Sequence, residues 1–182
     1  MQDCSAFRSR GGAGFTLVEL LIVIGIIGVL TALFAPELAT VRERAEAVIC
    51  MGHLRSLHVS FGSYLNDYEM WPQLPKDSNG AEVDLSVQQE DQFWLNTLKD
   101  YGADENVWRC PTRRRSLVQS ADPDVSKLDY TPTSFDDDPM TPRRWPGMPW
   151  LIDQGGHHGV NLMVRADGAV QSVQDALRES SN

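Results

Sequence analysis

The sequence predicts an α+β protein in which one long, kinked N-terminal helix packs against a small C-terminal antiparallel sheet, with the first half of the helix spanning a membrane. Three observations predict this class. Residues 15–35 are an apolar run, a helical stripe of apolar side chains lies between residues 47 and 68, and residues 160–173 alternate around a turn. Each pattern is long or regular enough to define one element.

The apolar run at residues 15–35 is 21 residues long and contains one charged side chain, Glu19. As a helix it is about 31 Å long, which is roughly the thickness of the hydrocarbon core of a bilayer. A secretory signal peptide has a shorter apolar region followed by a cleavage site of small residues, whereas this run ends at Pro36. We therefore expect a transmembrane helix, with a cleaved signal peptide as the less favoured alternative.

The helix is expected to continue to about Asp67. Pro36 removes one backbone hydrogen bond, so we expect a bend or local melting near residues 32–36. Residues 37–46 are charged and form the predicted neck between membrane and domain. Beyond them, apolar side chains recur in alternating steps of three and four residues, the signature of one buried helix face. These positions are Ala47, Cys50, Leu54, Leu57, Phe61, Tyr64 and Tyr68.

The middle of the chain carries weaker patterns. Residues 71–75 are too rich in proline for a helix, and residues 76–80, KDSNG, predict a turn. Residues 93–98 predict a short amphipathic helix that closes near Gly102 with a glycine C-cap. A short strand or extended segment is expected at residues 107–111.

The C-terminal part predicts a β-hairpin. Residues 160–165 alternate, Asp167 and Gly168 supply a turn, and residues 169–173 return. The helical stripe is the one long apolar face available to cover this hairpin, so we expect the sheet to lie across the second half of the helix. Residues 120–149 are rich in Asp and Pro, and we assign them no regular structure.

The chain is acidic, with 25 Asp and Glu residues against 16 Lys and Arg and a net charge of −9. Such a surface disfavours nucleic acid and anionic lipid as partners. Two clusters are exceptions, the arginines at residues 113–115 and those at residues 143–144. We interpret both as solvated loops rather than as phosphate sites.

A short leader with Arg8 and Arg10 precedes residues 14–24, GFTLVELLIVI. This start resembles the N-terminus of the type IV pilins and of the pseudopilins of type II secretion. The resemblance implies a pilin-like fold with a cytoplasmic N-terminus and a periplasmic domain. Charge counting alone does not fix this orientation, because Arg42 and Arg44 follow the apolar run and nearly cancel the bias of the leader.

The resemblance also implies roles for single residues. A prepilin peptidase would cut after Gly14 and methylate the new amino terminus at Phe15. Glu19 would meet the free amino group of a neighbouring subunit, and a carboxylate and an ammonium group attract strongly among apolar helices. The alternative for Glu19 is a tolerated charge in an ordinary anchor. Pro36 falls where these pilins often have a proline, at the helix kink.

A second resemblance lies near the C-terminus. His157, nine intervening residues and then Asp167-Gly168 are similar to the His-x9-Asp-Gly signature of a class of pilin-like bacterial proteins. Looser similarities to that class are found at residues 50–55, 68–72 and 109–111. Residues 120–149 have no counterpart in that class.

The three cysteines divide into one in the leader, Cys4, and two beyond the apolar run, Cys50 and Cys110. An even pair in an oxidising compartment favours a disulfide, and here it would join the helix to the extended segment at residues 107–111. The alternative is two buried thiols that act as small hydrophobic side chains.

Metal sites are less favoured than structural roles for the candidate ligands. His157 and His158 could join Asp153 and Asp167 around a metal, but the glycines beside the histidines favour a loop whose imidazole binds backbone. The acidic run at residues 136–138 lacks the spaced oxygens and glycine of an EF-hand, so calcium binding is the less favoured alternative. We expect neither a metal nor another cofactor.

These patterns predict a division into a prepilin leader at residues 1–14, a transmembrane and assembly helix at 15–35, its extracytoplasmic continuation at 36–68 and a small globular domain at 69–182. No nucleophile elbow, phosphate-binding loop or zinc-protease motif is present in the sequence, so we expect no enzymatic activity.

The expected function is that of a structural subunit in a type IV pilus-like or type II secretion pseudopilus fibre, anchored in the bacterial inner membrane before assembly. A competence-type fibre fits equally. The predicted partners are a prepilin peptidase, other pilin or pseudopilin subunits in a homo- or heteropolymer, and an inner-membrane assembly platform. Two alternatives are a single-pass periplasmic binding domain that never polymerises and a metal-dependent enzyme built around His157 and His158.

Overall fold

The structure is a computed structural model that describes residues 15–80, 83–113, 126–138, 140–154, 156 and 160–180. The chain divides between Val41 and Arg42 into two units. Helix α1 (Leu17–Tyr68) contributes to both units.

The N-terminal unit consists, in its described part, of the first half of α1. Residues 17–35 have a mean hydropathy of 2.7 and no buried side chain, and they are long and apolar enough to cross a membrane. The helix continues through Pro36 without interruption. The predicted local melting therefore does not occur, because the remaining backbone bonds hold the turn. The bend at Pro36 stays a prediction.

The C-terminal unit is built on the second half of α1, and the predicted stripe supplies its core. Cys50, Leu54, Leu57 and Phe61 are fully buried. The end of the stripe was predicted wrongly, because Tyr68 is exposed and Leu65 is buried instead. From Leu57 onward the most buried side chains follow steps of four residues, from 57 to 61 to 65. The predicted alternation holds in part at Tyr64, which is half-buried and packs against the core, and it fails at Tyr68.

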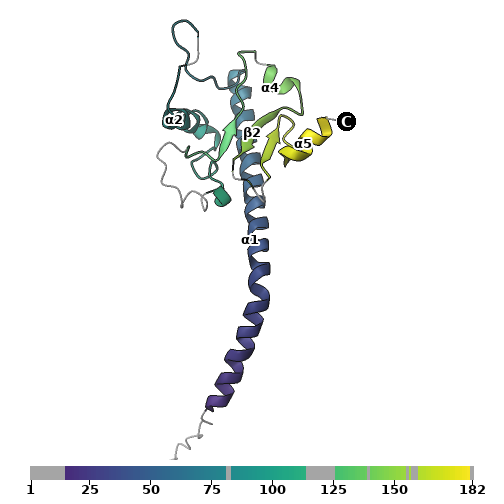
Figure 1. Cartoon of the computed structure of the whole chain (residues 1–182). Coiled ribbons are helices and arrows are strands. Elements are labelled where there is room, and N and C mark those ends of the chain that lie inside the picture. The colour runs from purple at the N-terminus through teal and green to yellow at the C-terminus, as the bar shows by residue number, and fades with distance from the viewer. Residues whose placement is uncertain are drawn as a thin grey trace, which may run out of the picture. The chain divides into compact units, whose positions relative to one another are not determined.

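The sheet has four antiparallel strands in the order β1-β2-β3-β4 and lies beside α1 (Figure 1). The strands are β1 (Tyr130–Pro132), β2 (Pro149–Asp153), β3 (Leu162–Arg165) and β4 (Val170–Ser172). The predicted hairpin is confirmed as β3 and β4, with Met163 opposite Gln171. Leu151 and Val164 are fully buried in the same core as the stripe, so the predicted packing of sheet on helix is also confirmed.

Two predictions on the irregular parts are corrected. Residues 120–149 do contain regular structure, namely β1, the start of β2 and the short helix α4 (Thr141–Arg144). Residues 107–111 form no strand, because Val107 and Arg109 donate their N–H groups to turn carbonyls at residues 104 and 106. Short elements of three or four residues leave little periodicity, which is why their composition concealed them.

The helix predicted at residues 93–98 is longer than expected. Helix α2 (Val87–Leu98) begins with a capping box between Ser86 and Gln89. It continues into the 3-10 helix η1 (Lys99–Tyr101), which ends at Gly102 with φ 86°, so the glycine cap is confirmed. A further helix, α5 (Val173–Ser180), follows β4 and was not predicted.

Aromatic side chains fill the core between α1, α2 and the sheet. Phe61 stacks on Trp71 with ring centroids 4.4 Å apart, and Trp94 and Trp108 pack against the other sides of Phe61. Trp150 of β2 meets Trp71 at 5.2 Å. Because aromatic rings bury a large area each, this cluster links α2 and β2 to α1.

Candidate functional site: the start of the long helix

The first turn of α1 is a capping box. Glu19 Oε2 accepts hydrogen bonds from Thr16 N at 2.9 Å and from Thr16 Oγ1 at 2.6 Å, and Glu19 N donates to Thr16 Oγ1 at 3.2 Å. Such a box satisfies N–H groups that a helix otherwise leaves open at its N-terminus. Glu19 therefore has partners within its own chain. The sequence analysis missed this pairing, although Thr-x-x-Glu before an apolar run is its known signal.

The residue that precedes this box is the predicted new N-terminus. Phe15 is described and 75% exposed, whereas Gly14 lies outside the described residues. A cut after Gly14 would leave an α-amino group on Phe15, next in sequence to Thr16. The Glu19 carboxylate thus lies at the end of the helix where that amino group would stand.

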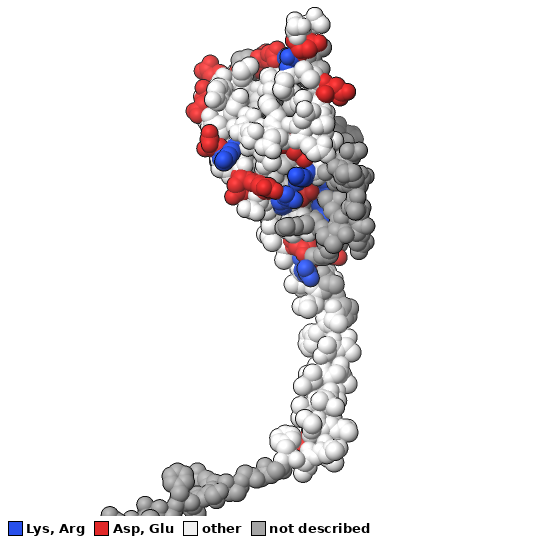
Figure 2. All heavy atoms as spheres, turned by 90° about the vertical axis from the view of Figure 1, so that its left-hand side faces the viewer, with Lys and Arg blue, Asp and Glu red and all other residues white. Residues whose placement is uncertain are grey.

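The segment beyond the box exposes a continuous apolar surface. On the face that Figure 2 shows, the first half of α1 is almost free of charged side chains, whereas acidic side chains are spread over the globular unit. Leu17 is 77% exposed and Leu33 is 67% exposed. Apolar surface of this extent is stable only when lipid or other apolar protein surface covers it.

The Asp167-Gly168 part of the C-terminal signature forms the turn between β3 and β4. Gly168 has φ 81°, its N–H donates to Arg165 O, and Asp167 Oδ1 accepts from Ala169 N at 3.0 Å. Hydrogen bonds from Arg165 hold the pKa of the Asp167 carboxyl below its ordinary value. The aspartate and glycine are thereby explained as turn residues. His157, the other end of the signature, lies outside the described residues.

His58 of α1 is a residue that sequence reasoning missed. Its Nε2 lies 3.1 Å from Ala166 O, and its ring stacks on Trp150 at 4.5 Å. These contacts fasten the β3–β4 turn to the helix. No motif surrounds this histidine, so its position at a helix–turn contact could be found only from the fold.

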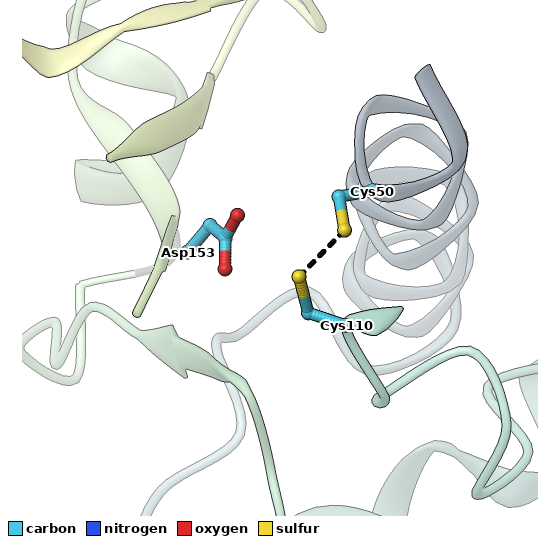
Figure 3. A group of neighbouring side chains, drawn as sticks. All are labelled: Cys50, Cys110 and Asp153. Atoms are coloured by element: carbon cyan, nitrogen blue, oxygen red, sulfur yellow. Dashed lines mark hydrogen bonds between the residues drawn. The ribbon is translucent and has the colours of Figure 1, made fainter. Parts of the chain in front are cut away.

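Cys50 and Cys110 lie together in the core. Both are fully buried, their Sγ atoms are 2.6 Å apart, and no bond joins them in the structure (Figure 3). The carboxylate of Asp153 faces the pair, and its oxygen and the two sulfurs lie within 4.8 Å of one another. The hydrogen bond with Cys110, together with burial, raises the pKa of the Cys50 thiol. The structure thus brings together the predicted pair, and the disulfide itself stays a prediction.

The other candidate metal ligands that the structure describes lie at different places in the domain. Of the four residues weighed for a metal, Asp153 lies beside the cysteines and Asp167 in the β3–β4 turn, while His157 and His158 lie outside the described residues. In the acidic run, Asp137 pairs with Lys76 Nζ at 2.8 Å. Calcium binding there stays an untested alternative.

The interpretation of the first arginine cluster as a solvated loop was wrong for Arg113, while Arg114 and Arg115 lie outside the described residues. The Arg113 side chain is only 14% exposed, and its Nε lies 3.5 Å from Oδ1 of the buried Asp129. It is therefore part of the domain structure rather than a solvated loop, because a buried carboxylate needs a cationic or hydrogen-bonding partner. In the other cluster, Arg143 donates to Asn66 at 2.7 Å and Arg144 lies over the ring of Trp145.

A capped, exposed apolar helix of membrane-spanning length that continues into the core of a small α+β domain defines the pilin-like class of proteins. Comparison with known proteins agrees. Residues 9–35 match the family of the prokaryotic N-terminal methylation motif. The match covers the end of the predicted leader, the predicted cleavage position after Gly14, Glu19 and the apolar run.

Known relatives come from both branches of this class. The chain is 30% identical over 107 residues to type II secretion system core protein G of Pectobacterium carotovorum subsp. carotovorum, which covers 59% of this chain and 62% of the relative. It is 47% identical over 85 residues to the type IV wide pilus major component PilA4 of Thermus thermophilus, which covers 43% of this chain and 65% of the relative. Core protein G of Pseudomonas aeruginosa is 29% identical over 65 residues, which is 36% of this chain and 46% of the relative.

The chain spans less than two thirds of the length of these relatives. No solved structure gives a significant match. The motif and the relatives together support a place for this chain in the pilin and pseudopilin family, a family of structural proteins.

Proposed function

We propose that the protein is a structural subunit of a type IV pilus-like or type II secretion pseudopilus fibre and assembles through its N-terminal helix. The observation that carries this proposal is the fully exposed apolar segment at residues 17–35. Lipid covers such a segment before assembly, and the same segments of neighbouring subunits can cover it in a fibre. One surface thereby serves both states.

In this proposal the negative charge of Glu19 sets the position of each subunit relative to its neighbour in the fibre. Among the residues that the structure describes, the partners of Glu19 are the N–H and O–H of Thr16, both of which are neutral donors. The capping box therefore orients the carboxylate but leaves its negative charge uncompensated. Among packed apolar helices that charge is costly unless a cation pairs with it. The α-amino group of a neighbouring subunit, created by a cut before Phe15, is a cation of the required kind.

The proposal also includes how the N-terminus is processed and how the chain is oriented in the membrane. A prepilin peptidase of the inner membrane would cleave after Gly14 and methylate Phe15. The N-terminus would lie in the cytoplasm, and residues beyond the apolar run would lie in the periplasm. The match of residues 9–35 to the methylation motif supports this sequence of steps.

Co-expression with a prepilin peptidase tests the first step. Intact-mass analysis of protein extracted from membranes should show a chain that begins with N-methylated Phe15. Sheared surface fractions or purified secretion complexes should then contain this processed chain in fibres. A chain that keeps Met1 beside an active peptidase would refute the proposal.

A single-pass binding domain that never polymerises is the alternative function. It predicts that the chain stays in the membrane fraction as a monomer under conditions in which a known pilin of the same host assembles. Cysteine cross-linking between apolar segments separates the two, because only packed fibre subunits bring those segments into contact.

A further inference from the structure

Residues 109–112 follow the surface of α1 in the opposite direction to the helix. Three contacts, each about one helical turn from the next, fix this arrangement. They are Glu46 to Thr112 Oγ1 at 3.4 Å, Cys50 Sγ to Cys110 Sγ at 2.6 Å, and His53 Nδ1 to Arg109 O at 2.9 Å. The cysteine contact is the middle one, so its register is set from both sides.

Cys110 is also held from the side of the sheet. Its N–H donates to Asp129 Oδ2 at 2.6 Å, and Asp129 N donates to Trp108 O at 2.9 Å. Asp129 directly precedes β1, so this loop joins the first strand to the segment that carries Cys110. The two sulfur atoms are therefore brought together by contacts other than their own.

The geometry of the pair distinguishes between a bond and a shared metal. Two thiolates on one tetrahedral zinc stand roughly 3.8 Å apart, because each zinc–sulfur distance is about 2.3 Å. The sulfur atoms of a disulfide stand about 2.0 Å apart. The observed 2.6 Å is too short for two thiolates on one zinc, and it is about 0.6 Å longer than a disulfide bond, so the two sulfur atoms would have to close by that distance. Among the described residues, Asp153 would be the third ligand of a metal, whereas structural zinc sites use four protein ligands.

We propose that Cys50 and Cys110 form a disulfide that fastens residues 109–112 to α1. The proposal rests on the periplasmic placement proposed above, because disulfides form and persist in oxidising compartments. Its consequence for a fibre subunit is a covalent link between the assembly helix and the domain that this helix carries.

The bond forms by exchange with the disulfide of a periplasmic thiol oxidase. One cysteine thiolate attacks a sulfur of that disulfide, and a mixed disulfide forms as the enzyme's second thiolate leaves. The other cysteine, as its thiolate, then displaces the enzyme and closes the bond. The two electrons reduce the oxidase to a dithiol, and the two protons of the substrate thiols end on it.

Burial determines when this exchange takes place. Both thiols are fully buried, and the raised pKa of Cys50 keeps its thiolate scarce in the folded domain. The bond therefore forms while the chain is still entering the periplasm, before the core closes. A domain that has folded in the reduced state should oxidise many times more slowly than the unfolded chain.

The first test uses the full chain with Cys4→Ser, so that two thiols remain. Cells are quenched with acid, free thiols are alkylated, and peptides are analysed by mass spectrometry without reductant. The expected product joins the peptides of Cys50 and Cys110 and is two hydrogens lighter than their sum. Two alkylated cysteines, in cells whose domain is digested by protease added to spheroplasts, would overturn the proposal.

The second test asks whether the disulfide can form independently of the proposed periplasmic location of the domain. The purified full chain is denatured, reduced and refolded in detergent with a glutathione redox buffer. If the bond forms here but not in cells, and the domain resists protease added to spheroplasts, then the periplasmic placement is wrong and the disulfide geometry is right. If refolded chains keep two thiols, the disulfide proposal fails whatever the placement.

The same refolding experiment with Zn²⁺ alone tests the metal alternative. One zinc per chain, bound so that it prevents alkylation until a chelator is added, would overturn the disulfide. Cys50→Ser and Cys110→Ser are matched controls. In the Cys4→Ser background, each should leave one alkylated cysteine and abolish the linked peptide.

Discussion

His58 and Gly168 are in contact distance across the boundary between α1 and the β3–β4 turn. A Cβ atom built at position 168 would lie 3.3 Å from His58 Cε1, and the backbone there has φ 81°. Glycine is thus favoured at this position by its left-handed conformation, and any added Cβ would also need the His58 ring to move by a few tenths of an ångström. The relationship gives the Asp-Gly pair of the signature a structural role at a contact between helix and sheet.

Replacement of Gly168 tests this relationship. Gly168→Ala should lower the free energy of unfolding by more than the roughly 1–2 kcal/mol that a left-handed conformation costs a residue with a side chain. Gly80→Ala is the matched control, because Gly80 has φ 80° and nothing within 4 Å of its added Cβ. Urea denaturation followed by tryptophan fluorescence measures both. If both substitutions lowered the free energy of unfolding equally, the contact with His58 would not contribute to stability.

Glu19 can be tested with its neutral isostere. Glu19→Gln should keep the capping box, since glutamine accepts the same hydrogen bonds, but it removes the negative charge. We expect normal cleavage and a loss of fibres by at least tenfold in sheared fractions. Thr16→Ala removes the donor hydroxyl and keeps the charge, so it should assemble better than Glu19→Gln. Normal fibres from Glu19→Gln would refute the registering role.

Cleavage depends on the small residue before the cut. Gly14→Val should leave the chain at its full length, because the added branched side chain blocks close approach of a peptidase to the backbone. The measurement is the N-terminal mass after co-expression with the peptidase. The protein should still reach the membrane, which separates failed processing from failed insertion. Efficient cleavage of Gly14→Val would show that the cut lies elsewhere.

Reduction should destabilise the domain if the cysteines are bonded. The bond would close a loop of 60 residues, which in the loop-entropy model stabilises the folded state by about 4 kcal/mol. Dithiothreitol should therefore lower the urea midpoint of the wild-type chain. The double variant Cys50→Ala with Cys110→Ala should show no such dependence on reductant. An unchanged wild-type midpoint would argue against a stabilising bond.

Asp129 should make stability depend on pH. Burial raises its pKa to about 6, against the opposing effects of the Cys110 N–H and the Arg113 guanidinium. The folded state then binds this proton more tightly than the unfolded chain does. Its contribution is complete below pH 4 and is lost as pH rises to about 6. After a discount for solvent screening, we expect about 1–2 kcal/mol.

The control for this pH dependence is Asp129→Asn, which still accepts a hydrogen bond from Cys110 but does not titrate. The difference in unfolding free energy between wild type and variant, followed from pH 4 to pH 7, isolates the group from other carboxylates. A constant difference would show that the pKa of Asp129 is not raised.

Long periodic patterns in the sequence predicted the main elements correctly. The apolar run and the stripe from Cys50 to Phe61 specify α1, because each repeats over several turns. The hairpin was predictable from its alternation and from the Asp167-Gly168 turn. These elements already determine that the sheet covers the helix.

The remaining features depend on contacts between distant residues. Strand β1 has three residues and ends in Pro132, so only its pairing with β2 identifies it. Arg113 resembled a solvated charge until Asp129 was placed beside it. The capping boxes at Thr16 and Ser86 are the exceptions, since both have a local sequence signal that was overlooked.

Glu46 is the first buried side chain among the described positions of α1, and the core cluster begins at Cys50. A host protease that cut the helix near Val41 would thus release a fragment with its entire described core intact. Such shedding would separate the domain from lipid at no cost to its fold. The exposed turns before Glu46 are accordingly the place where limited proteolysis should yield a water-soluble product.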